Sequence, residues 1–76
     1  MITVKLLAVL KEYAPNGGCI ALPYTQGMTV AEALAATDIA RATVKYSVMV
    51  GNRRKKPEDI LGDGDIVIVM PLLAGG

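Results

Sequence analysis

The sequence contains no histidine, no tryptophan and no phenylalanine, and it has a single cysteine, Cys19. One cysteine cannot form a disulfide bond within the chain, and without histidine there is no cysteine–histidine ligand set for zinc. The lack of histidine also excludes a histidine general base and a serine–histidine–aspartate triad. Three tyrosines are the only aromatic residues, which argues against a base-stacking platform. We therefore expect no metal site and no nucleic-acid binding.

The chain also has little net charge and no long apolar run. Its 8 basic and 7 acidic residues give a net charge of +1, which provides no overall attraction to nucleic acid or to an anionic membrane. No stretch approaches the roughly 20 apolar residues that cross a bilayer. Lys5 and Lys11 interrupt the first residues, unlike the apolar core of a secretory signal. We expect a cytoplasmic protein that does not associate with membranes.

The 76 residues are 53% hydrophobic, a content that suits one small folded domain. A domain of this size buries only about 60% of the surface that its unfolded chain exposes. The hydrophobic content is high for so small a body, so we expect part of the apolar surface to remain exposed for a partner.

Residue patterns predict the order strand, strand, helix, strand, strand. Alternating or uniformly apolar residues bounded by turn residues predict strands over 2–6, 19–22, 46–50 and 66–70. A short helical turn is expected over 8–13, and a single helical turn is expected to begin at Pro57. Thr29 and Glu32 have the spacing of a capping box, so the main helix should begin there and end between Thr37 and Ala40.

This order predicts an α+β fold with a small mixed sheet and one main helix packed on one face. The segment 66–70 is apolar at every position, which favours a central strand. One helix covers only one face of such a sheet, so the other face is a candidate docking surface. We expect Val67 and Val69 to contribute to it. The alternative is that loops cover that face.

Arg53-Arg54-Lys55-Lys56 is the only run of charges in the sequence. A run of this kind is most often a solvated turn, and we expect one here. The functional alternative is that Arg53 and Arg54 contact an acidic groove on a partner protein, where charge complementarity raises the rate of association, or an anionic cofactor precursor.

The sequence ends in Gly75-Gly76. Glycine loses more backbone freedom on ordering than any other residue, so stability does not explain this pair. Because glycine has no Cβ, such an end fits a narrow passage and presents its carboxylate to another protein's active site. We predict a domain over 1–71 and a flexible tail over 72–76, with the reacting carboxylate on Gly76. The residues expected to contact the partner are Pro71, Leu72, Leu73, Ala74 and Gly75. The alternative is an ordinary frayed terminus.

Three stretches resemble the MoaD/ThiS ubiquitin-like sulfur-carrier family. They are 4–14, 29–34 and 63–76, and together they span most of the chain. The last is the most specific, because Asp63-Gly64-Asp65, an apolar strand, Pro71 and the Gly-Gly end follow one another in the family's order. MoaD proteins often carry two prolines and a valine before Ala-Gly-Gly, whereas this chain has Pro71-Leu72-Leu73. The resemblance implies the ubiquitin-like β-grasp fold.

The resemblance also implies a function. In this family, an E1-like adenylyltransferase of the MoeB or ThiF type uses ATP to adenylate the terminal carboxylate, here that of Gly76. A sulfur donor converts it to a thiocarboxylate, and a synthase of the MoaE or ThiG type accepts the sulfur. Molybdopterin synthesis is the favoured pathway, and thiamine thiazole synthesis is next. The chain would be a protein cosubstrate, countable as the small subunit of a synthase, and not itself an enzyme.

No Gly-rich phosphate-binding motif is present, so we expect ATP to be bound by the activating partner and no cofactor to be bound by this chain. Two alternatives remain open at this point. One is a protein modifier in which Gly76 is joined to lysines of target proteins. The other is a non-covalent β-grasp interaction domain.

Overall fold

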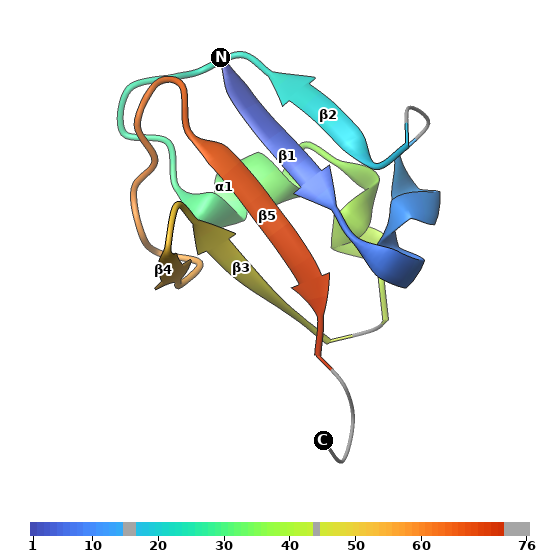
Figure 1. The fold of residues 1–76 in the computed structure, drawn as a ribbon. Helices are drawn as coiled ribbons and strands as arrows, with labels where there is room; N and C mark the ends of the chain where they lie inside the picture. Colours follow the sequence, from blue (N-terminus) through green and yellow to red (C-terminus); the bar gives the residue numbers. More distant parts are fainter. Residues whose placement is uncertain (15–16, 44, 73–76) are drawn as a thin grey trace.

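The computed structural model describes residues 1–14, 17–43 and 45–72. Five strands form one sheet in the order β2-β1-β5-β3-β4 (Figure 1). The strands are β1 (Ile2–Leu6), β2 (Cys19–Leu22), β3 (Tyr46–Val50), β4 (Arg53–Lys55) and β5 (Ile66–Pro71). β1 and β5 are parallel, and the other neighbouring strands are antiparallel. The predicted mixed sheet and α+β class are confirmed.

β1 follows directly from its alternating sequence. Ile2, Val4 and Leu6 are buried on the face toward the core. The 3-10 helix η1 (Ala8–Tyr13) then leads toward β2. Gly18, just before β2, has a φ of 93°, and a Cβ placed there would lie 2.4 Å from the Leu6 carbonyl oxygen. Only glycine tolerates both this backbone conformation and this close approach.

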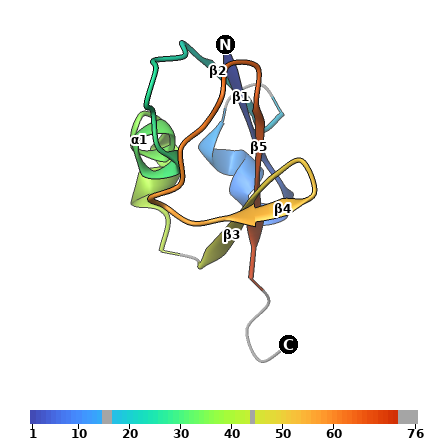
Figure 2. The ribbon, with the colours of Figure 1, turned by 90° about the vertical axis from the view of Figure 1, so that its left-hand side faces the viewer.

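The helix α1 (Val30–Ala35) packs against one side of the sheet and leaves the other side free (Figure 2). The predicted capping box is confirmed. The Thr29 hydroxyl accepts the Glu32 N–H at 3.2 Å, and the Glu32 carboxylate accepts the Thr29 N–H at 3.0 Å. Val30, Ala33 and Leu34 are the buried residues of this helix, and they close the core over β1 and β5.

The predicted end of the main helix is wrong by a few residues. α1 ends at Ala35, and a 3-10 helix, η2 (Asp38–Arg41), follows as a separate element. Thr37 is the reason for the break. Its hydroxyl donates to the Leu34 carbonyl at 2.8 Å and accepts the Ile39 N–H at 3.3 Å. A threonine bonded in this way caps a new helix instead of continuing the old one.

The segment after β3 also differs from the prediction. Arg53–Lys55 form β4 rather than a turn, because the two-residue Gly51-Asn52 turn, with Gly51 at a φ of 63°, folds the chain back on β3. The helical turn predicted at Pro57 is absent. Asp59 closes a turn instead: its carboxylate accepts the Lys56 N–H at 2.8 Å, and its N–H donates to the Lys56 carbonyl at 3.0 Å.

The core lies between the sheet and the helical elements. All buried side chains in the described part of the chain are apolar. The largest fully buried ones come from β1, β5, α1, both 3-10 helices and the loop before β5: Ile2, Val4, Leu6, Leu10, Val30, Ile39, Leu61, Val67 and Val69. No helix within residues 1–14, 17–43 and 45–72 is long and apolar enough to cross a membrane.

Candidate functional site

The first feature of the site is the place where the chain leaves the sheet. β5 lies between β1 and β3, which confirms its predicted central position. Pro71 is the last paired residue, opposite Tyr46, and the next residue, Leu72, donates its N–H to the Lys45 carbonyl at 2.9 Å. The Leu72 side chain is 47% exposed. It is therefore available to a partner at the end of the central strand.

The residues that follow carry the predicted chemistry. The predictions for Leu73, Ala74, Gly75 and Gly76 lie outside the described residues. The structure describes the chain as far as Leu72, which is bonded through its N–H to the Lys45 carbonyl.

The prediction that Val67 and Val69 contact a partner is wrong. Both side chains are fully buried. They pair with Val4 and Leu6 on β1, and residues directly opposite one another in a sheet share a face. Their side chains therefore point into the core beneath α1, where no partner protein can reach them.

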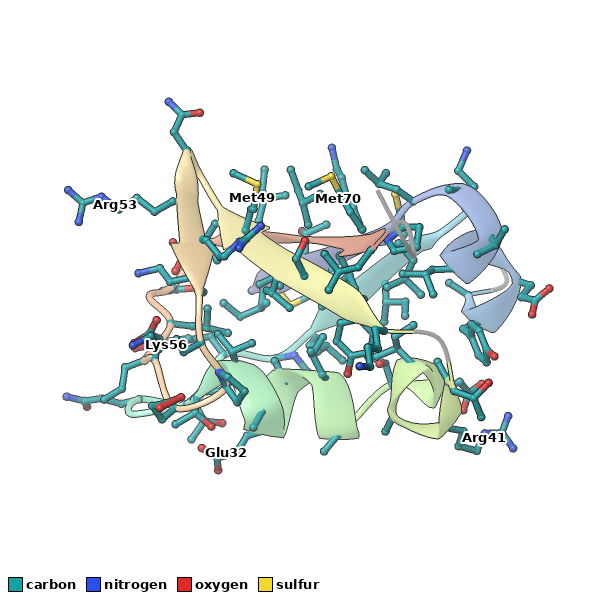
Figure 3. The ribbon with its side chains drawn as sticks, turned by 90° about the horizontal axis from the view of Figure 1, so that it is seen from below. Glu32, Arg41, Met49, Arg53, Lys56 and Met70 are labelled. Atoms are coloured by element: carbon teal, nitrogen blue, oxygen red, sulfur yellow. The ribbon has the colours of Figure 1, made fainter. Side chains whose placement is uncertain are left out.

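The exposed side of β5 consists of the alternate residues, Ile66, Ile68 and Met70. Ile66 is 45% exposed, and the other two are partly buried. Figure 3 shows Met49 and Met70 pointing away from the sheet on the side opposite α1. The strand register places further residues on this side, which we call the open face: Thr3, Lys5, Ser47, Met49, Ile66, Ile68 and Met70.

The open face has an apolar centre and a polar border. Ile68 lies opposite both Lys5 and Met49, and Met70 lies opposite Ser47. No helix among residues 1–14, 17–43 and 45–72 covers this side (Figures 2 and 3). The prediction of an uncovered face on the sheet is confirmed. The residues of β5 that lie on it are Ile66, Ile68 and Met70, and not the predicted Val67 and Val69. The sequence does not indicate which alternate residues of this strand face the core, because every residue from Ile66 to Met70 is apolar.

Arg53 and Arg54 are both exposed on β4. Arg54 lies opposite Met49, so it borders the open face. Arg53 points away from the body (Figure 3). The ion pairs in the described part of the chain involve neither residue. Both guanidinium groups are thus free to contact a partner's carboxylates. The alternative that these arginines bind an acidic groove on a partner therefore remains open.

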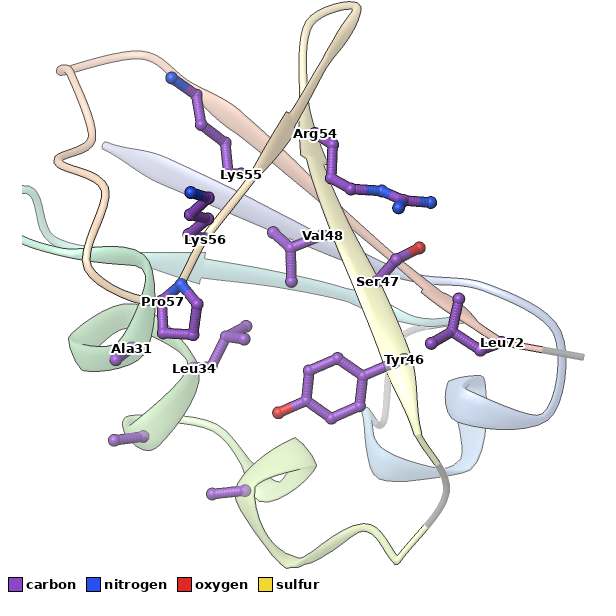
Figure 4. Close-up of a pocket in the computed structure, with 12 residues that line it drawn as sticks. Ala31, Leu34, Tyr46, Ser47, Val48, Arg54, Lys55, Lys56, Pro57 and Leu72 are labelled. Carbon is purple, nitrogen blue, oxygen red and sulfur yellow. The ribbon is translucent and has the colours of Figure 1, made fainter. Parts of the chain in front are cut away.

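A groove of about 500 Å³ lies beside the outer edge of β3, between α1 and the end of β5 (Figure 4). Sequence reasoning missed it, because it depends on β4 being too short to cover β3. We call it the edge groove. It is lined by Ala31, Leu34, Ala35, Ala40, Tyr46, Ser47, Val48, Arg54, Lys55, Lys56, Pro57 and Leu72.

The described residues contain no group of three cysteine, aspartate or glutamate side chains placed to hold a metal ion. Cys19 is exposed on the edge strand β2. The features that remain as candidates for function are the exit of β5, the open face and the edge groove.

Comparison with solved structures identifies a protein of the same fold. The structure superposes on the crystal structure of SAMP1 from Haloferax volcanii with a TM-score of 0.78, covering 99% of this chain and 98% of SAMP1. The chain has the ubiquitin-like β-grasp fold. Sequence identity to SAMP1 is 19%, so the likeness is one of fold. No family model matches the sequence, and no curated protein matches it.

Proposed function

We propose that this β-grasp protein is a sulfur carrier that reacts through the carboxylate of Gly76. One observation carries the proposal: the central strand β5 ends at Pro71, and the next residue, Leu72, donates its N–H to the Lys45 carbonyl and is 47% exposed. Four residues follow Leu72 in the sequence. Leu72, from which they continue, lies at the end of β5 beside the open face, and a Gly-Gly end is narrow enough to enter a partner's active site.

The chemistry requires two steps at Gly76. In the first, a carboxylate oxygen attacks the α-phosphorus of ATP, and pyrophosphate leaves with the electron pair of the broken P–O bond. In the second, sulfur supplied by a donor at the level of sulfide attacks the acyl carbon, a C–S bond forms, and AMP leaves. The product is a thiocarboxylate, an ionised and soft nucleophile.

The sequence supplies no phosphate-binding motif for the first step, so the proposal assigns ATP to an activating enzyme of the E1-like type, such as MoeB or ThiF. Sulfur then passes to a synthase. A MoaE-type synthase in molybdopterin formation is the favoured acceptor, and a ThiG-type synthase in thiazole formation is next. In this scheme the chain acts as a cosubstrate and contributes no catalytic side chain.

The open face supplies the docking surface in this proposal. A partner that packs on Ile68 and Met70 lies beside the end of β5, because Met70 immediately precedes Pro71. An apolar centre with a polar border is the usual anatomy of a protein interface. Recognition and delivery of the carboxylate therefore use adjacent parts of one surface.

The intact mass of the protein purified from its native host tests the proposal. We expect a population whose mass shows the exchange of one oxygen for sulfur, located to Gly76 by fragmentation. Branched peptides that join Gly76 to lysine, without any sulfur form, would instead identify a protein modifier. Neither product under conditions that require the cofactor pathway would reject both covalent functions and leave a non-covalent interaction domain.

A further inference from the structure

The outer edge of β3 is only partly covered by its neighbour. β4 ends at Lys55, which pairs with Val48. Tyr46 and Ser47 continue β3 beyond that pair. The chain after Lys55 turns instead toward α1, where the Pro57 carbonyl accepts the N–H of a residue in the first turn of the helix at 2.9 Å. Within the described residues, no strand lies beside Tyr46 on this edge.

The hydrogen bonds of the sheet show which backbone groups point to this edge. Lys45 accepts the N–H of Leu72, so its carbonyl points toward β5. Bonding groups alternate between the two sides of a strand, so the N–H and C=O of Tyr46 point the opposite way, to the uncovered edge. No turn or loop among residues 1–14, 17–43 and 45–72 supplies a backbone partner for them.

The edge groove has two walls, one on each side of this free edge (Figure 4). Leu34, Tyr46 and Val48 form an apolar wall on the side of α1, and Ser47 and Leu72 lie on the other side. A strand placed in the groove would send alternate side chains to the two walls. The groove therefore has the form of an empty strand position.

The β4 end of the groove is positively charged. Arg54, Lys55 and Lys56 line it, and none of its lining residues is acidic. The nearby carboxylates of Glu32 and Asp59 accept backbone N–H groups of the capping box and of the turn after β4. The ion pairs found in the described part of the chain involve none of the three cations. An incoming anionic group would thus meet cations that no carboxylate of the groove neutralises.

We propose that the edge groove binds a short extended peptide segment, with an apolar side chain flanked by acidic ones, as an added strand against Tyr46. Strand addition of this kind takes its affinity from main-chain hydrogen bonds and its specificity from pockets for alternate side chains. The edge groove adjoins the open face, because Ser47 belongs to both and Arg54 lies between them. Peptide binding there involves no reaction at Gly76, so the inference does not depend on the function proposed above.

The register of the added strand follows from the pairing rules. We place the peptide antiparallel to β3, so that the residue opposite Tyr46 exchanges two backbone hydrogen bonds with it and shares its face. An apolar side chain there packs against Leu34. The next residue toward β4 faces the other wall, where Arg54 lies. Lys55 of β4 already fills the position opposite Val48, so the residue after that leaves the edge of β3 and passes beside Lys55 and Lys56. Acidic residues at those two positions complement the charges of the groove.

The probe is a synthetic peptide, acetyl-Gly-Glu-Asp-Ile-Asp-Glu-Gly-amide, which carries acidic residues on both sides of the isoleucine. It is titrated into the isotope-labelled full chain at low salt, and binding is followed by NMR. We expect the largest chemical-shift changes at Tyr46 and Ser47 and slower hydrogen exchange of the Tyr46 N–H. Added salt should weaken binding, because the attraction is between exposed charges.

Two peptide controls separate the contributions. A peptide N-methylated at the isoleucine lacks the donor for the Tyr46 carbonyl and should bind about tenfold more weakly. A peptide with asparagine and glutamine in place of the acids should lose a similar factor. Equal binding of the N-methylated peptide, or shifts centred on Met49 and Met70, would overturn the proposal. So would the absence of shifts with the acidic peptide at millimolar concentration.

Matched variants of the protein complete the test. The double variant Lys55→Gln with Lys56→Gln removes two charges of the groove and should weaken acidic-peptide binding about tenfold. The variant Arg53→Gln removes a charge from the same strand but outside the groove, and should change binding by less than about twofold. If both variants weaken binding equally, the attraction is one of general charge and the assigned site is wrong.

Discussion

The backbone N–H of Leu72 donates to the carbonyl oxygen of Lys45 at 2.9 Å, one residue beyond the last strand pair of β5. This bond marks the limit of the body on the central strand. The four residues after Leu72 span roughly 13–14 Å when extended, at about 3.3–3.6 Å per residue. That length lets the open face rest on a partner's surface while the carboxylate of Gly76 enters a buried site.

Changing the length of the tail should abolish activation without changing the fold. Deletion of Gly76, or addition of one residue after it, moves the carboxylate by about 3.3–3.6 Å, and a misplacement of even 1 Å costs about 10²-fold in rate. We expect no pyrophosphate exchange with the activating enzyme and an unchanged NMR spectrum for the body.

The matched control for that experiment is Ala74→Gly, which keeps the tail length and adds no bulk. It should be activated at close to the normal rate. Normal thiocarboxylate formation by the variant lacking Gly76 would contradict the proposed reaction.

Polar substitutions on the open face should weaken docking to the activating enzyme. Ile68→Ser and Met70→Ser each remove apolar contact area from the centre of the proposed interface, and an important interface residue costs about 1–2 kcal/mol or more. We expect KM for the carrier to rise roughly tenfold. Val9→Ser is the control, since Val9 is 62% exposed on η1 and is not one of the strand residues that form the open face. An equal effect at Val9 would show that the open face is not the docking surface.

Shortening Val69 should affect stability and leave docking unchanged. The side chain is fully buried, so Val69→Ala leaves a small cavity and should lower the free energy of unfolding by about 1–3 kcal/mol. Urea denaturation measures the change. At a temperature where the variant is fully folded, its KM with the activating enzyme should match that of the natural sequence. A higher KM for the folded variant would show instead that Val69 contacts the activating enzyme.

Two glycines with similar backbone angles should respond differently to alanine. Gly18 and Gly27 have φ of 93° and 83°, and a Cβ at Gly27 meets nothing within 4 Å. Gly27→Ala should therefore cost only the backbone strain, about 1–2 kcal/mol. Gly18→Ala adds a clash with the carbonyl of Leu6 and should cost clearly more. Thermal or urea unfolding of the two variants compares them, and equal losses would show that β1 moves away to admit the methyl group.

Charge reversal on β4 tests whether its arginines guide association. Arg53→Glu with Arg54→Glu should slow binding to an acidic surface of the activating enzyme at low salt, with the difference shrinking as salt is added. Stopped-flow association rates at two ionic strengths measure the effect. An unchanged rate at low salt would mean that the two side chains are simply solvated.

Local signals in the sequence predicted much of the fold. The capping box at Thr29 and Glu32, the alternation that buries Val4 and the apolar segment of β5 each specify an element with little help from distant residues. Such local signals were not sufficient where one sequence pattern is compatible with more than one local structure, as at the end of α1. Thr37 was read as part of the helix, although its hydroxyl both closes α1 and caps η2.

The candidate site was less predictable, because it depends on pairing between distant segments. The uniformly apolar sequence of β5 does not distinguish the residues that face α1 from those that face away. For this reason the prediction places Val67, and not Ile68, at the surface. The edge groove arises because β4 stops at Lys55, opposite Val48. In the sequence, Lys55 and Lys56 are visible only as part of a run of charges. Strand register, which the sequence does not state, decides both features.

The position of β5 also has a consequence for biosynthesis. β5 is made last, yet it fills the middle of the sheet and joins β1 to β3. A nascent chain that has not reached Ile66 therefore has two sheet fragments with no strand between them, and it cannot close its core on the ribosome. Completion of the body and emergence of the segment that follows it are thus coupled in time, so an activating enzyme that recognises the assembled sheet would not engage an unfinished chain.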